Sequence, residues 1–261
     1  MPSSASERPP SREAPRPGAG VLPVPERSHP FRVGFPEARR IQERLRGLVV
    51  VDDALGPVRT VAGVDVSHQR GSAVLHAAVV VLDLRTGERL EVAHGCAPAD
   101  FPYVPGYLSF REIPALLDAF ARLSAAPDLI VCDGHGRAHP RRFGLACHLG
   151  VLLDLPAVGC AKSLLIGSYQ EPGARRGCHR RILDGGEVIG EAVRTRDGVA
   201  PVFVSVGHRV RLETARRLVL RLARGTRLPE TTRQAHREVN RLRRELEPPR
   251  GRFASAGFAG G

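Results

Sequence analysis

The order of the apolar runs along this chain limits its fold more than any other feature. Three β-branched runs are separated only by short polar turns: 61–66, 73–84 and 90–93. Such spacing predicts a three-strand antiparallel meander. Two short, continuously apolar runs follow at 129–132 and 157–160, which is typical of buried parallel strands. The sequence therefore predicts an α/β protein built on a mixed sheet.

Helical periodicity supplies elements to flank this sheet. Apolar residues recur at helical spacing in five segments: 38–51, 113–123, 145–153, 212–222 and 232–246. A hairpin near 187–194 and a strand at 202–206 complete the predicted elements. With 261 residues and 42% hydrophobic content, the chain is long enough for one well-buried core. We therefore expect a single domain over residues 31–247.

The two ends of the chain differ from this domain in composition. Residues 1–30 contain eight prolines together with Ser, Arg and Glu, which predicts a disordered tail, and residues 248–261 predict a flexible Gly/Arg tail. The sequence shows no secretory signal and no apolar run of about 18 residues. Five scattered cysteines favour neither a disulfide scaffold nor a zinc site, so we expect reduced core thiols. We expect a monomeric cytoplasmic protein that does not enter a membrane.

The chain is strongly basic, and its basic residues are almost all arginine. A formal net charge of +12 attracts polyanions, of which nucleic acid is the commonest inside a cell. An arginine-rich proteome is the alternative explanation for this charge. Lys162 is the single lysine among 39 basic side chains. Because an ammonium differs from a guanidinium in reach and proton chemistry, Lys162 is a candidate functional residue, with chance survival as the alternative.

Three acidic residues stand at positions that suit metal binding. Asp65 lies inside an apolar strand, where a carboxylate is costly unless it is paired or bound to a cation; a turn-capping role is the alternative. Asp133 ends a buried strand, at the edge where open α/β sheets collect ligands. Glu112 lies near the start of a helix. Mg²⁺ binds through one or two carboxylates while keeping several waters, and it assists phosphodiester hydrolysis.

An unusual loop precedes the second predicted helix. Pro102 and Pro105 flank Tyr103 and Val104, and Gly106 lets the chain turn away. Because proline restricts the backbone and lacks an N–H donor, the tyrosine is held on a stiff, protruding turn. Such a stiff aromatic tip suggests a wedge. The simpler alternative is a rigid surface loop whose tyrosine lies against the core.

Four motifs together resemble the Endonuclease V family of metal-dependent nucleases: Gly63-Val64-Asp65, 102–112, 133–142 and 228–236. The resemblance covers about residues 38–247 and implies a five-stranded mixed sheet of ribonuclease H type. It also implies that Mg²⁺ is the cofactor, with Mn²⁺ as a substitute, and that the partner is inosine-containing DNA or RNA. The implied reaction nicks the second phosphodiester bond 3′ to deoxyinosine, leaving 3′-hydroxyl and 5′-phosphate ends, in DNA repair.

The site residues that follow from the resemblance fall into two sets. The catalytic set is Asp65, Glu112, Asp133, Lys162 and His236, of which the three acids hold the metal. The substrate-binding set is Pro102, Tyr103, Val104, Pro105, Gly134, Gly136 and His139. The two glycines allow close backbone approach, so their N–H groups can bind O6 of a flipped hypoxanthine, with a role as turn residues as the alternative.

Two departures from the family pattern concern other residues. Many relatives have proline where this chain has Thr231, which we expect to affect the start of the last helix rather than the chemistry. His135 stands where relatives often carry glutamine, and we assign it no role.

Other functions remain open. An inosine-specific endoribonuclease would use the same residues on a different polymer. A structure-directed nuclease of ribonuclease H type, such as a junction resolvase or an exonuclease, would need no inosine. A non-catalytic nucleic-acid binder is disfavoured, because it leaves the three acids without a role.

Overall fold

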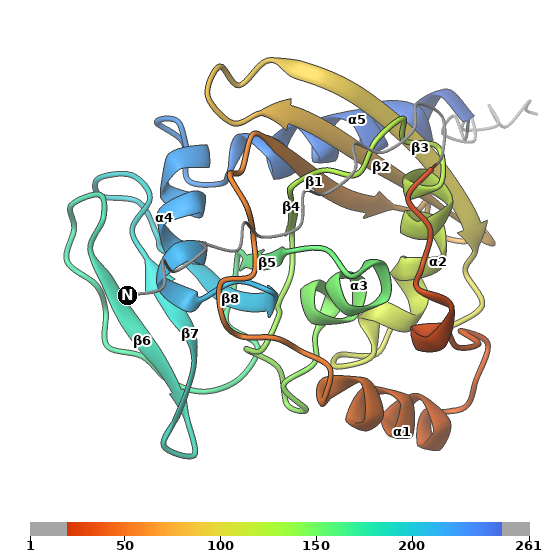
Figure 1. Cartoon of the computed structure of the whole chain (residues 1–261), viewed down its shortest axis with the longest axis horizontal. Coiled ribbons are helices and arrows are strands. Elements are labelled where there is room, and N and C mark those ends of the chain that lie inside the picture. Colours follow the sequence, from red (N-terminus) through yellow and green to blue (C-terminus); the bar gives the residue numbers. More distant parts are fainter. Residues whose placement is uncertain (1–19, 247–261) are drawn as a thin grey trace, which may run out of the picture.

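The computed structural model describes residues 20–246, which form eight strands and the helices that flank them. The strands are β1 (Thr60–Ser67), β2 (Val74–Asp83), β3 (Arg89–Pro98), β4 (Leu129–Cys132), β5 (Ala157–Ala161), β6 (His179–Asp184), β7 (Glu187–Val193) and β8 (Val202–His208). The helices are a short 3₁₀ turn η1 (Pro25–Arg27), α1 (Phe35–Arg46), α2 (Leu108–Phe120), α3 (Leu145–Leu153), α4 (Leu212–Leu222) and α5 (Glu230–Leu246). Within these residues all eight strands belong to one sheet, in the order β3-β2-β1-β4-β5-β8-β7-β6 (Figure 1).

The predicted meander is confirmed. β1 pairs antiparallel with β2, and β2 pairs antiparallel with β3. Gly87, with φ of +79°, turns the chain between β2 and β3 in the left-handed region that favours glycine. The alternation of apolar runs and turns was sufficient to predict this half of the sheet, because hairpins depend on local sequence.

The centre and the far half of the sheet differ in part from expectation. β4 lies parallel to β1 and β5 lies parallel to β4, as predicted. The sheet does not stop at five strands, because β8 pairs antiparallel with the free edge of β5 and the hairpin of β6 and β7 continues from it. An open edge of unpaired N–H and C=O groups accepts another strand readily, so the five-stranded prediction is corrected to eight.

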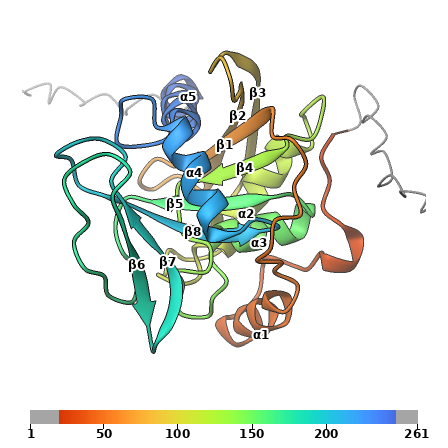
Figure 2. The ribbon, with the colours of Figure 1, turned by 60° about the vertical axis from the view of Figure 1, so that its left-hand side comes forward.

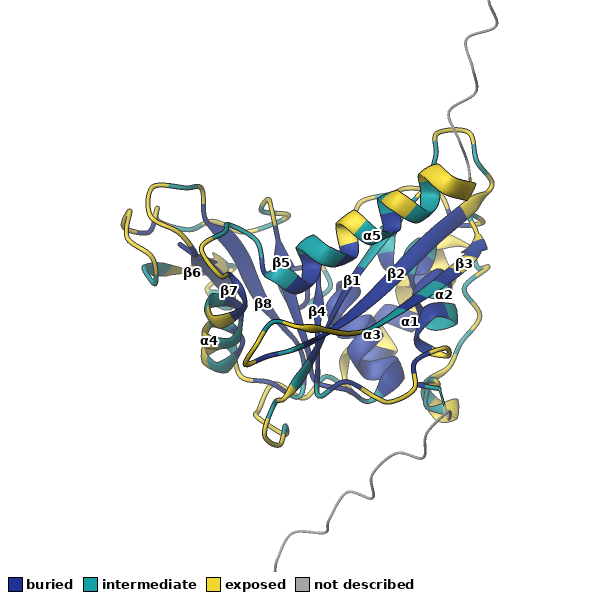
Figure 3. Ribbon diagram, turned by 90° about the horizontal axis from the view of Figure 1, so that it is seen from above, coloured by how far each residue is buried: buried dark blue, intermediate teal, exposed yellow. Residues whose placement is uncertain are grey.

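Helices cover both faces of the sheet. α2 and α3 bury apolar side chains against one face, and α4 and α5 lie on the opposite face (Figure 2). α1 packs beyond α3 and closes a smaller aromatic cluster around Phe110 and Phe143. Seen from above, the central strands are buried, whereas α5 keeps an exposed outer side (Figure 3). Within residues 20–246, no helix combines the length and the apolar character needed to cross a membrane.

Part of the predicted N-terminal tail is ordered. Val21 is buried and donates its N–H to Phe120 O at 3.0 Å, and the N–H of Val24 donates to Leu152 O at 2.7 Å. Both carbonyls stand at the ends of helices, where they lack partners within the helix. The prediction of disorder is therefore wrong for residues 20–30, while 1–19 and 247–261 lie outside the described residues.

A histidine pair ties the same segment to the domain. His29 donates from Nδ1 to Pro30 O at 2.9 Å, so its Nε2 accepts from Nε2–H of His148 at 2.7 Å. The remaining ring nitrogen of His148 then accepts from the Ser109 hydroxyl at 2.9 Å. Burial lowers the pKa of both histidines. Composition did not reveal this contact, because it joins residues more than 100 positions apart.

The cysteines are free, as expected. Cys132, Cys147 and Cys160 are buried, and burial raises the pKa of each thiol. Cys96 is exposed on β3 and Cys178 is half-buried, so the description of all five as core thiols is wrong for these two residues.

Candidate active site

The candidate active site lies at the edge where the parallel strands end. Val64 of β1 pairs with Cys132 of β4, and Cys132 pairs with Gly159 of β5. Asp65 and Asp133 are the next residues on their strands. Parallel strands in register place the residues that follow a matched pair next to each other. The two aspartates are therefore neighbours, and each is largely withdrawn from solvent.

Glu112 joins the two aspartates from the beginning of α2. Removal from water, together with repulsion by Asp65 and Asp133, raises the pKa of Glu112 to about 8. Burial also raises the pKa of Asp65, and the hydrogen bond from His236 opposes this shift. Three carboxylates that repel one another form a site that is short of positive charge.

Two basic side chains partly compensate the negative charge of these carboxylates. Lys162 follows directly after β5, and its Nζ lies 2.5 Å from Oδ2 of Asp133. His236 comes from α5 and donates from Nδ1 to Oδ2 of Asp65 at 2.7 Å. The structure thus brings all five residues of the predicted catalytic set to one edge of the sheet.

A glycine in β1 explains how α5 reaches this site. A Cβ atom at Gly63 would lie 2.2 Å from the carbonyl oxygen of Thr231, so no larger residue fits there. The first turn of α5 therefore rests directly on β1. His236, just over one helical turn further along α5, then faces Asp65, two residues beyond Gly63.

The donor set fits an oxygen-ligated divalent cation. The acids come from three separate elements and repel each other, a cost that a cation would relieve. Within residues 20–246, no group of three or more His, Cys, Asp or Glu side chains is already arranged around a single metal position. Asp65 and Asp133 instead contact His236 and Lys162. Carboxylates with room for water suit Mg²⁺ or Mn²⁺ rather than the nitrogen and sulfur ligands that zinc favours.

A cavity of about 320 Å³ opens beside Asp133 and Lys162. Its walls come from three segments that are far apart in sequence: 103–109, 133–145 and 161–165. The size and mixed lining are typical of a small-molecule site. Tyr103, Val104, Gly134 and His139 of the predicted substrate-binding set all line it, as does Pro105.

The loop that carries Tyr103 is held at a single carbonyl group. Gly106 has φ of +83°, and its carbonyl oxygen accepts hydrogen bonds from Gln42 at 3.1 Å, His139 at 3.0 Å and Arg141 at 2.5 Å. Three donors on one oxygen leave the loop little freedom. Tyr103 itself is 73% exposed. The alternative of a tyrosine lying against the core is therefore wrong.

His139 has a different place from the one expected. Its Nε2–H donates to Gly106 O, so its Nδ1 accepts the N–H of Arg141 at 3.2 Å. Both ring nitrogens are engaged within the protein, and burial lowers the pKa of His139 to about 3. The neutral ring lines the cavity and positions the loop, but it has no free nitrogen for a substrate.

The role predicted for Gly134 and Gly136 is also corrected in part. The N–H of Gly136 donates to Ser205 Oγ at 2.8 Å, and the N–H of Gly134 donates to Cys132 O at 3.0 Å. Neither group is therefore free to read a base. A Cβ at Gly136 would lie 2.0 Å from Val206 O, so this glycine is needed for packing against β8. Gly134 has ordinary space around it and lines the cavity.

Gln42 and Arg141 were not predicted as functional residues. Arg141 lies within the motif at 133–142, and its guanidinium also stacks over the Tyr107 ring, 4.2 Å from the ring centre. Gln42 is a fully buried polar residue of α1, between Ile41 and Leu45. A glutamine on the apolar face of a predicted helix was the available signal, because a buried amide needs partners.

Comparisons with known proteins agree with this geometry. The family model Endonuclease V matches residues 43–237. An Endonuclease V of Roseiflexus sp. (strain RS-1) is 57% identical over 206 residues, which are 79% of this chain and 92% of the relative.

Solved structures show the same likeness. The crystal structure of Endonuclease V from Streptomyces avermitilis has 48% identity and a TM-score of 0.79, covering 82% of this chain and 95% of that one. Endonuclease V of Ciona intestinalis, solved in complex with a 24mer DNA containing an inosine followed by a ribo-adenosine, has 29% identity and a TM-score of 0.74, covering 82% and 99%. The chain therefore belongs to the Endonuclease V family, with its ribonuclease H-like fold, and is a nuclease that hydrolyses phosphodiester bonds.

Proposed function

We propose that this protein is a Mg²⁺-dependent endonuclease that nicks DNA at the second phosphodiester bond 3′ to deoxyinosine, in the repair of deaminated adenine. Mn²⁺ can take the place of Mg²⁺. The products carry 3′-hydroxyl and 5′-phosphate ends. The DNA-bound Ciona intestinalis relative supports the choice of substrate.

The main support for this proposal is that the cavity and the acidic site have two residues in common. Asp133 and Lys162 line the cavity on one side and belong to the charged site on the other. A base held in the cavity would therefore place the backbone that follows it next to the three carboxylates. A general nuclease has no need of a base-sized cavity at this position.

The three acids provide the metal-binding centre. Asp65, Glu112 and Asp133 would hold Mg²⁺, which supplies an activated water and neutralises negative charge on the phosphate. The raised pKa of Glu112 fits this role, because a group that resists ionising without a cation gains most from one. Water adds to phosphorus while the 3′ oxygen of the preceding nucleotide leaves, which yields the 3′-hydroxyl and 5′-phosphate ends.

Lys162 and His236 complete the site from opposite sides. The ammonium of Lys162 is partly exposed and lies at the border of the cavity, where it can donate to a non-bridging phosphate oxygen. His236 orients the Asp65 carboxylate through Nδ1, and more than half of its side chain remains accessible to an incoming strand.

The exposed ring of Tyr103 would occupy the gap left by a flipped base. Its loop is already held at Gly106, so little ordering is required on binding. Tyr103→Ala should lose about 1 to 3 kcal/mol of stacking. The loss should be larger on an inosine-cytosine duplex than on single-stranded inosine, whose base is already unpaired. Equal losses on both substrates in single-turnover cleavage would reduce Tyr103 to a structural role.

The decisive experiment compares matched oligonucleotides with and without one inosine. We expect Mg²⁺-dependent nicking only of the inosine strand, with the cut mapped to the second bond on its 3′ side. Asp65→Ala and Asp133→Ala should abolish the cut and leave binding largely intact. Cleavage that ignores inosine would refute the proposal, and faster cleavage of an RNA version would replace DNA by RNA as the substrate.

A further inference from the structure

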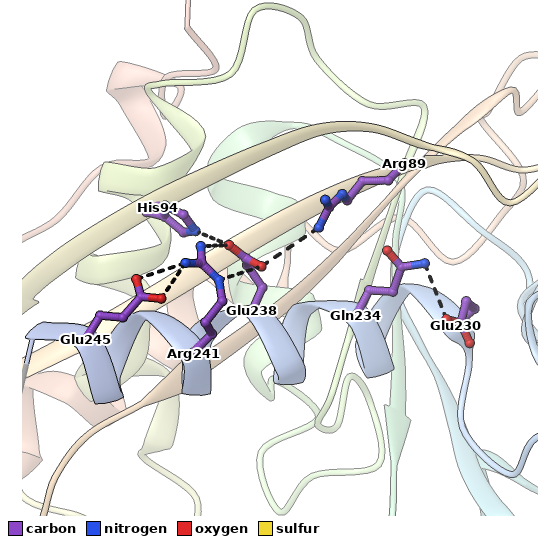
Figure 4. A network of polar contacts seen from close by, with 7 residues as sticks. All are labelled: Arg89, His94, Glu230, Gln234, Glu238, Arg241 and Glu245. Carbon is purple, nitrogen blue, oxygen red and sulfur yellow. Dashed lines mark hydrogen bonds and ion pairs between the residues drawn. The ribbon is translucent and has the colours of Figure 1, made fainter. Parts of the chain in front are cut away.

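Helix α5 carries arginines on two neighbouring faces with different surroundings. On one face, Arg241 lies between Glu238 and Glu245, at 2.6 Å and 2.7 Å (Figure 4). Glu238 also binds His94 of β3 at 2.9 Å and lies 3.9 Å from Arg89. The charges on this face are therefore satisfied within the protein, and they anchor α5 to the edge of the meander.

A neighbouring face of α5 is basic, and its two arginines, Arg237 and Arg244, have no ion pair within residues 20–246. Both are exposed. With His236 and Asn240 they line a hollow of about 340 Å³. Arg237, Asn240 and Arg244 are three, four and seven residues apart, so they share one side of the helix, and Arg241 differs from the two arginines because Glu238 and Glu245 hold it. Two free guanidinium groups along one hollow attract an anionic polymer.

This basic face is continuous with the active site. A second hollow, of about 280 Å³, is lined by His236 and Arg237 and reaches Asp133 and Lys162. The base-sized cavity lies against α2 and α3, on one face of the sheet, whereas α5 lies on the other face. A strand that leaves the cavity past Asp133 therefore crosses the edge of the sheet toward α5.

The direction of the strand follows from the proposed function, on which this inference rests. If the inosine lies in the cavity and the cut is made on its 3′ side, the nucleotides beyond the metal centre are those that follow the cut. We propose that Arg237 and Arg244 bind backbone phosphates of the cleaved strand on the 3′ side of the incision. The contact is with phosphate and does not depend on base sequence.

The spacing of the two arginines sets the length of strand required. Seven helical residues span about 10 Å at roughly 1.5 Å each. One strand of a duplex advances about 3.4 Å per nucleotide, so the two guanidinium groups are about three nucleotides apart. A substrate with two nucleotides beyond the cut cannot reach both arginines, whereas one with ten nucleotides can.

The test uses the full-length protein and inosine oligonucleotides that share one 5′ flank and carry two or ten nucleotides beyond the cut. Binding is measured by fluorescence anisotropy in EDTA across a salt series, so that no cleavage occurs. On the long substrate, Arg237→Ala and Arg244→Ala should each reduce the slope of log affinity against log salt by about 0.7 to 0.9. On the short substrate, which can reach Arg237 beside Asp133 but not Arg244, the slope of Arg244→Ala should equal the wild-type slope.

Arg241→Ala is the matched control, because it removes the same side chain from the same helix at a position already paired with two glutamates. Its salt slope should equal that of the wild type. The inference is wrong if Arg241→Ala weakens binding as much as Arg237→Ala, or if Arg244→Ala loses as much on the short substrate as on the long one. Failure of wild-type protein to prefer inosine would refute the proposed function instead, since the flank comparison is independent of catalysis.

Discussion

Replacing Glu112 by glutamine should make the metal-free protein more stable while abolishing cleavage. Glu112 has a pKa of about 8 in the folded protein, against an ordinary value of 4.5. Between these two pH values the folded protein retains a proton that the unfolded chain releases. The free energy of unfolding of the wild type therefore falls as the pH rises through this window. Glutamine resembles the protonated acid and has no proton to lose, so the variant escapes this penalty.

The size of the effect follows from the pKa shift. At pH 7 the solution lies about 2.5 pH units above the pKa of Glu112 in the unfolded chain, and each unit is worth about 1.36 kcal/mol, so the variant gains about 3 kcal/mol. For a domain of this size, that gain corresponds to a rise of roughly 6 to 12 °C in the melting temperature. The gain should vanish below pH 4.5, where both states are protonated. Mg²⁺ should stabilise the wild type and reduce the difference.

The measurement is urea or thermal denaturation at pH 5, 6, 7 and 8, in EDTA and in Mg²⁺. Glu88→Gln is the control, because Glu88 is exposed and its side chain has no ion pair within the described residues. The reasoning is refuted if Glu112→Gln in EDTA is no more stable than the wild type at pH 7, or if its advantage does not grow from pH 5 to pH 8.

Three further predictions concern other parts of the molecule. Lys162→Arg should lower single-turnover cleavage by about a hundredfold although it conserves charge, because a forked guanidinium cannot take the place of a compact ammonium; full activity would contradict this. Thr231→Val should raise the free energy of unfolding by about 1 kcal/mol in urea, because Oγ1 of Thr231 is buried without a hydrogen-bond partner; a loss of stability would show that the hydroxyl is needed. Deleting residues 1–19 should leave the melting temperature unchanged. Deleting residues 1–30 should lower the free energy of unfolding by about 2 to 3 kcal/mol, because the buried Val21 and the His29 hydrogen bond are lost. Equal melting temperatures of the two deletion variants would show that residues 20–30 do not stabilise the domain.

Much of the candidate site could be predicted from local sequence. Asp133 ends a short apolar run, and strand ends of this kind collect at one edge of a parallel sheet whatever the rest of the chain does. Asp65 was conspicuous as a charge within an apolar strand, and Lys162 as the single lysine. The prolines around Tyr103 restrict the backbone and Gly106 permits the turn, so the stiff loop could also be predicted from the sequence. These features depend on a few neighbouring residues.

The partners of those residues were decided by the tertiary structure. His236 meets Asp65 because Gly63 lets α5 rest on β1, a contact between segments about 170 positions apart. The Gly106 carbonyl gathers three donors from two distant segments, which turned His139 from a substrate ligand into a support for the loop.

Features set by local sequence can also be distinguished from features set by tertiary packing across the whole fold. The sequence by itself determined the meander, the parallel strands and the chemical types at the site, because periodicity and turn chemistry act over a few residues. Only the folded chain decided that residues 20–30 are ordered, that the sheet has eight strands and that Glu112 resists ionisation. Each of these features depends on groups that are far apart in sequence and meet only when the chain folds. The raised pKa of Glu112 also depends on the exclusion of water by the packed groups around it.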